Sequence, residues 1–265
     1  MLHIYIFIKI LLTNGGWMKI AVCVNHVPDT ATKIKINSDG KTIDPSGVVF
    51  VLNPYDEFAV EESLKTKEKF GGEVFVISVG TEANKESIRK ALAMGADNGI
   101  LLKVDKEIDS NSVAKALSEE IKSIGCEIVF FGKQSVDFDN SITGQLTAEL
   151  LGYSCISTVV DLKIEDRRVT AESETEGGRH IVESEFPIVI TTQKGLNDPR
   201  YASLKGIMAA KKKVIEEKPA AVGNPISEII KMYNPPAKSP GRILGTDSSA
   251  IPELVRLLRE EAKVI

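Results

Sequence analysis

The residues best suited to bind a ligand lie together in the segment 132–145, directly after a predicted strand. Gly132 lets the backbone turn sharply as it leaves that strand. Ser141 and Thr143 add hydroxyl groups. A helix predicted to begin near Ile142 offers unpaired N–H groups and the positive end of its dipole. These features together predict a phosphate-binding cradle, in which Gly132 allows the backbone to approach the ligand closely.

Polar side chains in the same segment suit the remainder of a nucleotide. Gln134 and Asn140 carry amides that can read an adenine or a ribose. Asp137 and Asp139 would repel a phosphate, so they are better suited to cap the helix or to bind ribose hydroxyls. The segment lacks the G-x-G-x-x-G pattern of a Rossmann dinucleotide site. The residues alone therefore leave two interpretations open: a nucleotide-binding loop, and an ordinary loop whose polar side chains cap the helix.

Other unusual segments also fall beside predicted strand ends. Residues 25–30 follow the first strand, residues 53–56 begin a helix with Asn-Pro, and Gly80 follows a further strand. Ligands in open parallel sheets bind beyond the carboxyl ends of the strands. These segments are therefore candidates for the same site.

Composition and charge exclude several classes of function. The formal net charge of -4 gives no overall attraction to nucleic acid or to an anionic membrane. The one dense basic run, at 211–213, is typical of a solvated patch. We find no Walker A loop, catalytic triad or paired-carboxylate signature. The three histidines lack metal-ligand spacing, which disfavours hydrolases and metalloenzymes.

The cysteines indicate a reducing compartment. Cys23, Cys126 and Cys155 share no C-x-x-C spacing, and their odd number argues against a disulfide framework. We predict three reduced thiols and a location in a prokaryotic cytoplasm.

Residues 1–17 contain a short apolar stretch that precedes the regular pattern of the chain. Their apolar stretch is too short to span a bilayer and lacks the features of a secretory or mitochondrial signal. Met18 then opens a regular strand pattern. We expect translation to begin at Met18, with an additional edge strand or a membrane-touching tail as the alternative for residues 1–17.

From Met18 the sequence alternates between short apolar runs and amphipathic helices, which predicts an α/β fold with a parallel βαβ sheet. Pro54 at a helix start and Gly71 after its end mark one helix clearly. The predicted strands are 20–24, 48–52, 73–79, 100–104 and 127–131, the first two being read as buried parallel strands. The predicted helices are 54–70, 85–94, 112–124 and 142–151.

After Gly152 the pattern changes to strands with alternating polar residues, at 157–164, 169–174, 180–185 and 188–192. They predict a mixed or antiparallel extension of the sheet. From Val214 onward, repeated prolines are expected to break any regular element until a helix at 251–262. We therefore divide the chain into a nucleotide-binding α/β domain at 18–218 and a C-terminal arm at 219–265.

Five segments resemble the electron transfer flavoprotein β-subunit family, in the family's order. The resemblance extends from Met18 to about Pro219. The segments are MKIAVCVNHVPDT, LNPYDEFAVEESL, SIRKALAMGAD, GKQSVDFDNSITGQ and VESEFPIVITTQKGLNDPRYASLKGIMAAKKK. The fold that this resemblance implies is Rossmann-like and similar to adenine-nucleotide hydrolases.

The resemblance also implies a set of cofactors. Family members pair with a homologous α subunit, share one redox-active FAD with it, and bury an AMP without a redox role in β. Tyr55 would come near the flavin. Carried over by motif, the nucleotide contacts are Cys23, Asn53, Pro54, Tyr55, Asp56, Val79, Gly132, Lys133, Gln134, Ser135, Val136, Asp137, Phe138, Asp139, Asn140, Ser141, Ile142 and Thr143.

Partners are implied in the same way. The family's reduced flavin passes electrons from acyl-CoA dehydrogenases or similar flavoproteins to a quinone oxidoreductase, so the chain is expected to be an electron carrier subunit and not an enzyme. The arm would pack on the α subunit. Leu196 resembles the apolar anchor for the dehydrogenase, and its turn-rich surroundings predict that it is exposed. Thr30 stands where some relatives place an aromatic residue beside the flavin, which leaves the flavin contacts of this chain open.

Two alternatives remain at this stage. An electron-bifurcating β subunit would bind a second FAD in place of AMP and oxidise NADH, although the run at 140–145 resembles the AMP-binding type more closely. A stand-alone adenine-nucleotide-binding stress-type protein would suit the sheet, but it leaves residues 195–213 and the arm without a purpose.

Overall fold

The computed structural model describes residues 18–106, 108–237 and 240–265. The expected extension at residues 1–17 lies outside this range. Contacts divide the chain into a larger unit, which includes Ile43–Ile230, and a smaller unit, which comprises Ile36–Thr42 and Lys231–Ile265.

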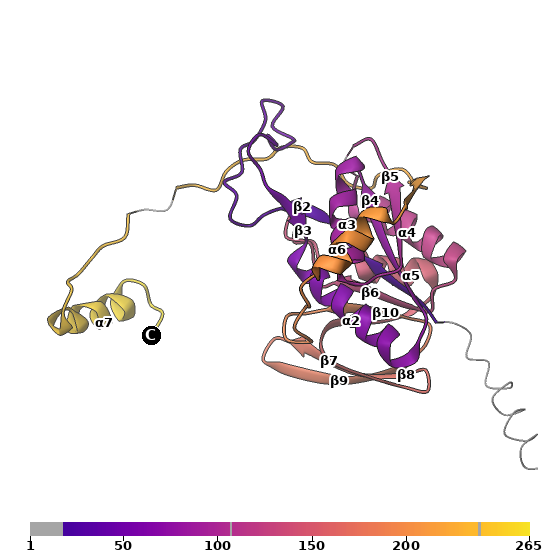
Figure 1. The fold of residues 1–265 in the computed structure, drawn as a ribbon. Helices are drawn as coiled ribbons and strands as arrows, with labels where there is room; N and C mark the ends of the chain where they lie inside the picture. Colours follow the sequence, from indigo (N-terminus) through magenta and orange to yellow (C-terminus); the bar gives the residue numbers. More distant parts are fainter. Residues whose placement is uncertain (1–17, 107, 238–239) are drawn as a thin grey trace, which may run out of the picture. The chain divides into compact units, whose positions relative to one another are not determined.

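A nine-stranded sheet forms the centre of the larger unit, in the order β11-β5-β4-β1-β6-β10-β7-β8-β9 (Figure 1). Neighbouring strands are parallel from β11 to β7 and antiparallel from β7 to β9. This confirms the predicted parallel sheet with a mixed extension. The strands are β1 (Lys19–Cys23), β4 (Glu73–Gly80), β5 (Asn98–Lys103), β6 (Ile128–Gly132), β7 (Ser154–Glu165), β8 (Arg168–Thr175), β9 (Gly178–Glu185), β10 (Ile188–Thr192) and β11 (Ile215–Pro219).

Helices pack on both faces of the sheet, as β1 shows. Ile20 and Val22 point into a core shared with α2, α3 and α6, whereas Ala21 and Cys23 point into a core shared with α4 and α5. Side chains alternate between the faces of a strand, so a strand buried on both faces is apolar throughout. The helices are α2 (Pro54–Phe70), α3 (Lys85–Met94), α4 (Ser110–Ile124), α5 (Thr143–Leu151) and α6 (Leu204–Lys212), with a short 3-10 turn at Glu82–Asn84.

Local signals set the helix boundaries that the sequence predicted best. Helix α2 begins with Pro54 and ends before Gly71, whose φ of 78° few other residues adopt. Helix α4 begins where the Asp109 side chain accepts a hydrogen bond from the Ser112 N–H. The predicted bounds of α2 and α3 are confirmed to the residue.

One predicted parallel strand is wrong. The run at 48–52 forms only β3 (Phe50–Leu52), which pairs antiparallel with β2 (His26–Pro28) in a separate two-stranded sheet. The His26 ring stacks on Phe50, with centroids 5.3 Å apart. The Asn53 N–H donates to Asn25 O at 3.1 Å, so this two-stranded sheet places the start of α2 beside the end of β1.

Two elements after residue 200 differ from expectation. Helix α6 was not predicted, although Met208, Ala209, Ala210 and the lysines after them are good helix formers. Strand β11 pairs with β5 at the edge of the sheet, because the segment Ile215–Lys218 contains no proline and Pro219 occupies only its last position.

The C-terminal helix is confirmed as α7 (Ile251–Glu260), preceded by a 3-10 turn at Ser248–Ala250. None of its residues is buried. Ile251, Leu254, Val255 and Leu258 follow the i, i+3, i+4, i+7 spacing of one helical face. The smaller unit therefore carries an amphipathic helix whose apolar face its own unit does not bury.

Candidate functional site

A pocket lies beyond the carboxyl ends of β1, β4 and β6. The connections after β1 and β6 leave the sheet in opposite directions, which makes this the switch point where doubly wound sheets bind ligands. The pocket lining includes most of the predicted contacts, namely Cys23, Asp56, Val79, Gly132, Lys133, Gln134, Ser135, Asp137, Phe138, Asn140, Ser141, Ile142 and Thr143.

Five predicted contacts lie behind or beside this lining. Pro54 is exposed at the start of α2, and Tyr55 is half-buried with the Lys133 Nζ 5.1 Å from its ring centroid. Asp139 accepts a hydrogen bond from Gln134 Nε2 at 2.6 Å. The remaining two are Asn53, which is buried, and Val136, which is half-buried.

Asp56 joins three elements at the floor of the pocket. Its carboxylate accepts hydrogen bonds from Asn25 N at 2.8 Å, Asn53 Nδ2 at 2.9 Å and Gly132 N at 3.2 Å. Burial raises the pKa of Asp56 to about 7, although these three hydrogen bonds lower it. The side chain thus links the ends of β1 and β6 to the first turn of α2.

Two asparagines tie the loop after β6 to this floor. Asn53 occupies the N-cap position of α2, but its side chain does not cap the helix. It donates to Gln134 O at 2.9 Å and accepts from Val136 N at 3.3 Å instead. The Asn25 amide donates to Ser135 Oγ at 3.0 Å and Asp137 Oδ2 at 2.9 Å. The protein's own side chains therefore hold the loop in shape.

Gly132 also has a structural reason to be glycine. A Cβ at this position would lie 2.4 Å from Asp56 Oδ1 and 2.7 Å from the Tyr55 carbonyl carbon. The glycine therefore makes room for the start of α2, and a larger residue would disturb the protein itself.

The start of α5 forms the opposite wall. Ile142 stands at the N-cap position and offers no side-chain hydrogen bond, so the first N–H groups of the helix remain open for an anion. Asp139 and Ser141 have φ values of 52° and 53°, which few residues other than glycine adopt. Such backbone geometry is common where a loop is shaped around a ligand. Gly144 lines the pocket as well and packs the helix closely on Phe131 and Thr191.

Less polar side chains complete the pocket. Cys23 is buried, and burial raises the pKa of its thiol well above the usual value, so it is a neutral wall residue. Val79 lies at the end of β4. The lining also includes Asn25 and His26, from the segment 25–30 that the sequence already placed beside this site. The sequence interpretation missed Lys106.

Leu196 is not the exposed residue that was expected. It is half-buried and packs against the hydrophobic core. Three later apolar residues are uncovered instead: Tyr201 is 99% exposed, Leu204 82% and Met208 56%. Leu204 and Met208 are one turn apart on α6 and share its outer face.

The structure also bears on metals and membranes. Within residues 18–106, 108–237 and 240–265, no cluster of three or more His, Cys, Asp or Glu could hold a metal ion. No helix in the described part of the chain is long and apolar enough to cross a membrane.

Comparison with known proteins agrees with the motifs. The electron transfer flavoprotein domain model matches residues 41–222. An electron transfer flavoprotein subunit beta from Bradyrhizobium diazoefficiens is 39% identical over 94% of this chain and 100% of its own length. Those from Bacillus subtilis and from Arabidopsis thaliana, the latter mitochondrial, are 36% and 34% identical with the same coverage. The chain belongs to the electron transfer flavoprotein β-subunit family.

Proposed function

We propose that this chain pairs with an α subunit to form an FAD-containing electron carrier. The carrier takes electrons from acyl-CoA dehydrogenases or similar flavoproteins and delivers them to a quinone oxidoreductase. The chain is not an enzyme by itself in this proposal, because the FAD shared with the α subunit supplies the redox chemistry. Its location would be a prokaryotic cytoplasm, consistent with three free cysteines.

The pocket at the switch point is the observation that carries the proposal, and its residues fit an AMP. The open N–H groups of α5, with the hydroxyls of Ser141 and Thr143, would hold the phosphate. Lys133 adds a positive charge to the lining, and Val79 adds an apolar wall for a base. Asp137 and Gln134 suit ribose and base contacts. This chain's own contribution is thus to bind and orient a nucleotide that carries no electrons.

The arm is proposed to pack on the α subunit. The row of apolar residues on α7 has no cover in its own unit, and a helix with an open apolar face gains stability from a partner. The half-buried Tyr55, under Lys133, is proposed to lie near the shared flavin.

The docking anchor is better assigned to Leu204 than to Leu196. An apolar anchor must be exposed before the partner arrives and buried afterwards. Leu204 satisfies the first condition, whereas Leu196 already packs on the core. We therefore take Tyr201, Leu204 and Met208 as the docking surface for the donor flavoprotein.

Nucleotide extraction tests the cofactor proposal. The heterodimer purified with its α subunit is denatured, and the released nucleotides are separated and quantified. We expect one FAD and one AMP per heterodimer. Two FAD without AMP would instead show the bifurcating type, which passes electrons from NADH. Absence of any nucleotide besides one FAD would contradict the pocket assignment.

Two leucine variants test the docking surface. Leu204→Ala should slow electron transfer from a reduced acyl-CoA dehydrogenase by about tenfold, the equivalent of about 1.4 kcal/mol of binding energy. Flavin content and melting temperature should stay unchanged, because the side chain is exposed. Leu196→Ala should do the opposite and lower the melting temperature. If both variants transfer electrons at the wild-type rate, the docking surface lies elsewhere.

A further inference from the structure

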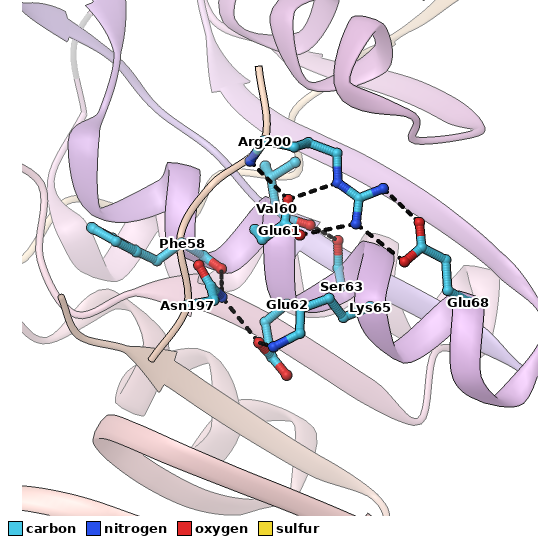
Figure 2. Close-up of polar contacts among 9 residues, drawn as sticks. All are labelled: Phe58, Val60, Glu61, Glu62, Ser63, Lys65, Glu68, Asn197 and Arg200. Atoms are coloured by element: carbon cyan, nitrogen blue, oxygen red, sulfur yellow. Dashed lines mark hydrogen bonds and ion pairs between the residues drawn. The ribbon is translucent and has the colours of Figure 1, made fainter. Parts of the chain in front are cut away.

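The segment between β10 and α6 is irregular but firmly attached to α2. Arg200 and Asn197 from this segment meet Glu61, Glu62 and Glu68 along one side of the helix (Figure 2). An irregular segment without such anchors would be poorly ordered, since it has no ladder of backbone hydrogen bonds.

Arg200 makes the strongest of these attachments. Its Nε and Nη2 donate to the two oxygens of Glu61 at 2.8 and 2.9 Å, and its backbone N–H donates to Glu61 Oε2 at 3.0 Å. Nη1 and Nη2 donate to the two oxygens of Glu68 at 2.5 and 3.1 Å. The guanidinium is thus bidentate to two carboxylates, a geometry that only its planar fork allows.

The two carboxylates are not equivalent. The Glu61 side chain is only 7% exposed, whereas that of Glu68 is 58% exposed. Ion pairs at exposed sites contribute little, but a buried carboxylate left without its partner is costly. Glu61 therefore holds Arg200 in place, and Glu68 completes the fork.

Asn197 gives the segment a second attachment. Its Nδ2 donates to Phe58 O and to Glu62 Oε2, both at 3.0 Å, while Leu196 beside it packs on the core. The chain between residues 196 and 200 is therefore held at both ends against α2.

The docking helix begins directly after this attachment. Helix α6 has nine residues, too few to be stable alone, so its position depends on what holds its ends. Ser203 caps its start by accepting from Gly206 N at 3.0 Å. Arg89 of α3 donates to the carbonyls of Ala210 and Lys213 at its other end. The inner face is close-packed, since a Cβ on Gly206 would lie 2.3 Å from Ala93 O.

We infer that Arg200 is a positioning residue for partner docking: its fork on Glu61 and Glu68 fixes the start of α6, so that Tyr201 and Leu204 face the partner already ordered. This inference rests on the docking surface proposed above. A surface that is ordered beforehand loses less conformational entropy on binding, and the gain appears as tighter association. The electron-transfer step within the bound complex does not involve Arg200.

Arg200→Lys tests the inference, because lysine keeps the charge but cannot form the fork. The control is Arg167→Lys, since Arg167 forms a similar bidentate pair with Glu127 at 2.9 and 2.6 Å in the turn between β7 and β8. Both variants are purified as heterodimers with the α subunit. Electron transfer is followed with an acyl-CoA dehydrogenase reduced by its own acyl-CoA substrate, at increasing dehydrogenase concentration.

We expect Arg200→Lys to raise the KM for the dehydrogenase about three- to tenfold while kcat, flavin content and AMP content stay near wild type. Glu61→Gln should shift KM in the same direction, and Arg167→Lys should leave it unchanged. An unchanged KM in Arg200→Lys, or an equal rise in Arg167→Lys, would overturn the inference. So would a loss of flavin or melting temperature with normal kinetics per folded molecule.

Leu204→Ala separates this inference from the proposed function. If Leu204→Ala raises KM and Arg200→Lys does not, only the positioning role fails. If neither variant changes KM while the wild type transfers electrons normally, the docking surface itself is wrong.

Discussion

Helix α2 supports two regions of opposite character, the proposed nucleotide pocket and the proposed docking surface. At its first turn, Asn53 and Asp56 bind the loop after β6 and close a pocket with polar hydrogen bonds. Further along, Glu61 and Glu68 hold Arg200 and leave the apolar side chains of Tyr201 and Leu204 uncovered. The pocket is concave and offers open N–H groups at the start of α5 to a small ligand. The proposed docking surface is exposed and apolar, as a surface that a partner covers is expected to be.

The comparison predicts that changes in the first turn of α2 damage the fold as well as the pocket. Asp56→Ala would leave three N–H donors, from Asn25, Asn53 and Gly132, without their acceptor. We expect a loss of about 2–4 kcal/mol in the free energy of unfolding and loss of the bound nucleotide. Urea denaturation and nucleotide extraction measure the two effects. Leu204→Ala serves as the control, and equal damage by both variants would remove the distinction between the regions.

Alanine substitutions at two glycines test the same difference, with a smaller expected effect on stability. Gly132→Ala places a Cβ 2.4 Å from Asp56 Oδ1, whereas Gly178→Ala meets nothing within 4 Å. We expect Gly132→Ala to cost about 1–3 kcal/mol of stability, because neither the carboxylate nor the Tyr55 backbone can move away freely. Gly178→Ala should change stability by less than about 0.5 kcal/mol. Thermal denaturation of both variants measures the difference. Similar melting temperatures would show that the start of α2 can shift to make room for the added methyl group.

Two aspartates are expected to give pH dependences of stability with opposite signs. Burial raises the folded-state pKa of Asp56 from 3.8 to about 7, so its protonated form stabilises the fold below pH 3.8 and this contribution is lost as pH rises through 7. Burial alone would raise the pKa of Asp109, but hydrogen bonds from Ser112, Ile226 and Ser227 lower it to about 2. Its contribution is therefore present above pH 3.8 and lost as pH falls towards 2.

Asparagine variants isolate the two contributions. The stability difference between wild type and Asp56→Asn should shift against the wild type between about pH 4 and 7. The difference between wild type and Asp109→Asn should stay constant above about pH 5 and shrink only in acid. A difference for Asp56→Asn that does not change with pH would show that its carboxyl stays in one protonation state.

Local signals in the sequence determined much of the fold. Pro54 and Gly71 set the bounds of α2, and apolar runs marked the parallel strands, because helix ends and buried strands depend on neighbouring residues. The segment 132–145 could also be predicted as a candidate ligand site, since glycine, hydroxyls and a helix start lie within one stretch of chain.

Which side chains are covered depends on contacts that form only in the folded chain. The motif placed Asp56 in the candidate site, but its burial depends on contacts with Asn25 and Gly132, which are distant in the chain. Leu196 and Leu204 lie close together in the chain, but Leu196 packs on the core whereas Leu204 faces outward from α6. Burial and ion pairs such as Arg200 with Glu61 arise from segments that meet only after folding, so no local pattern reports them.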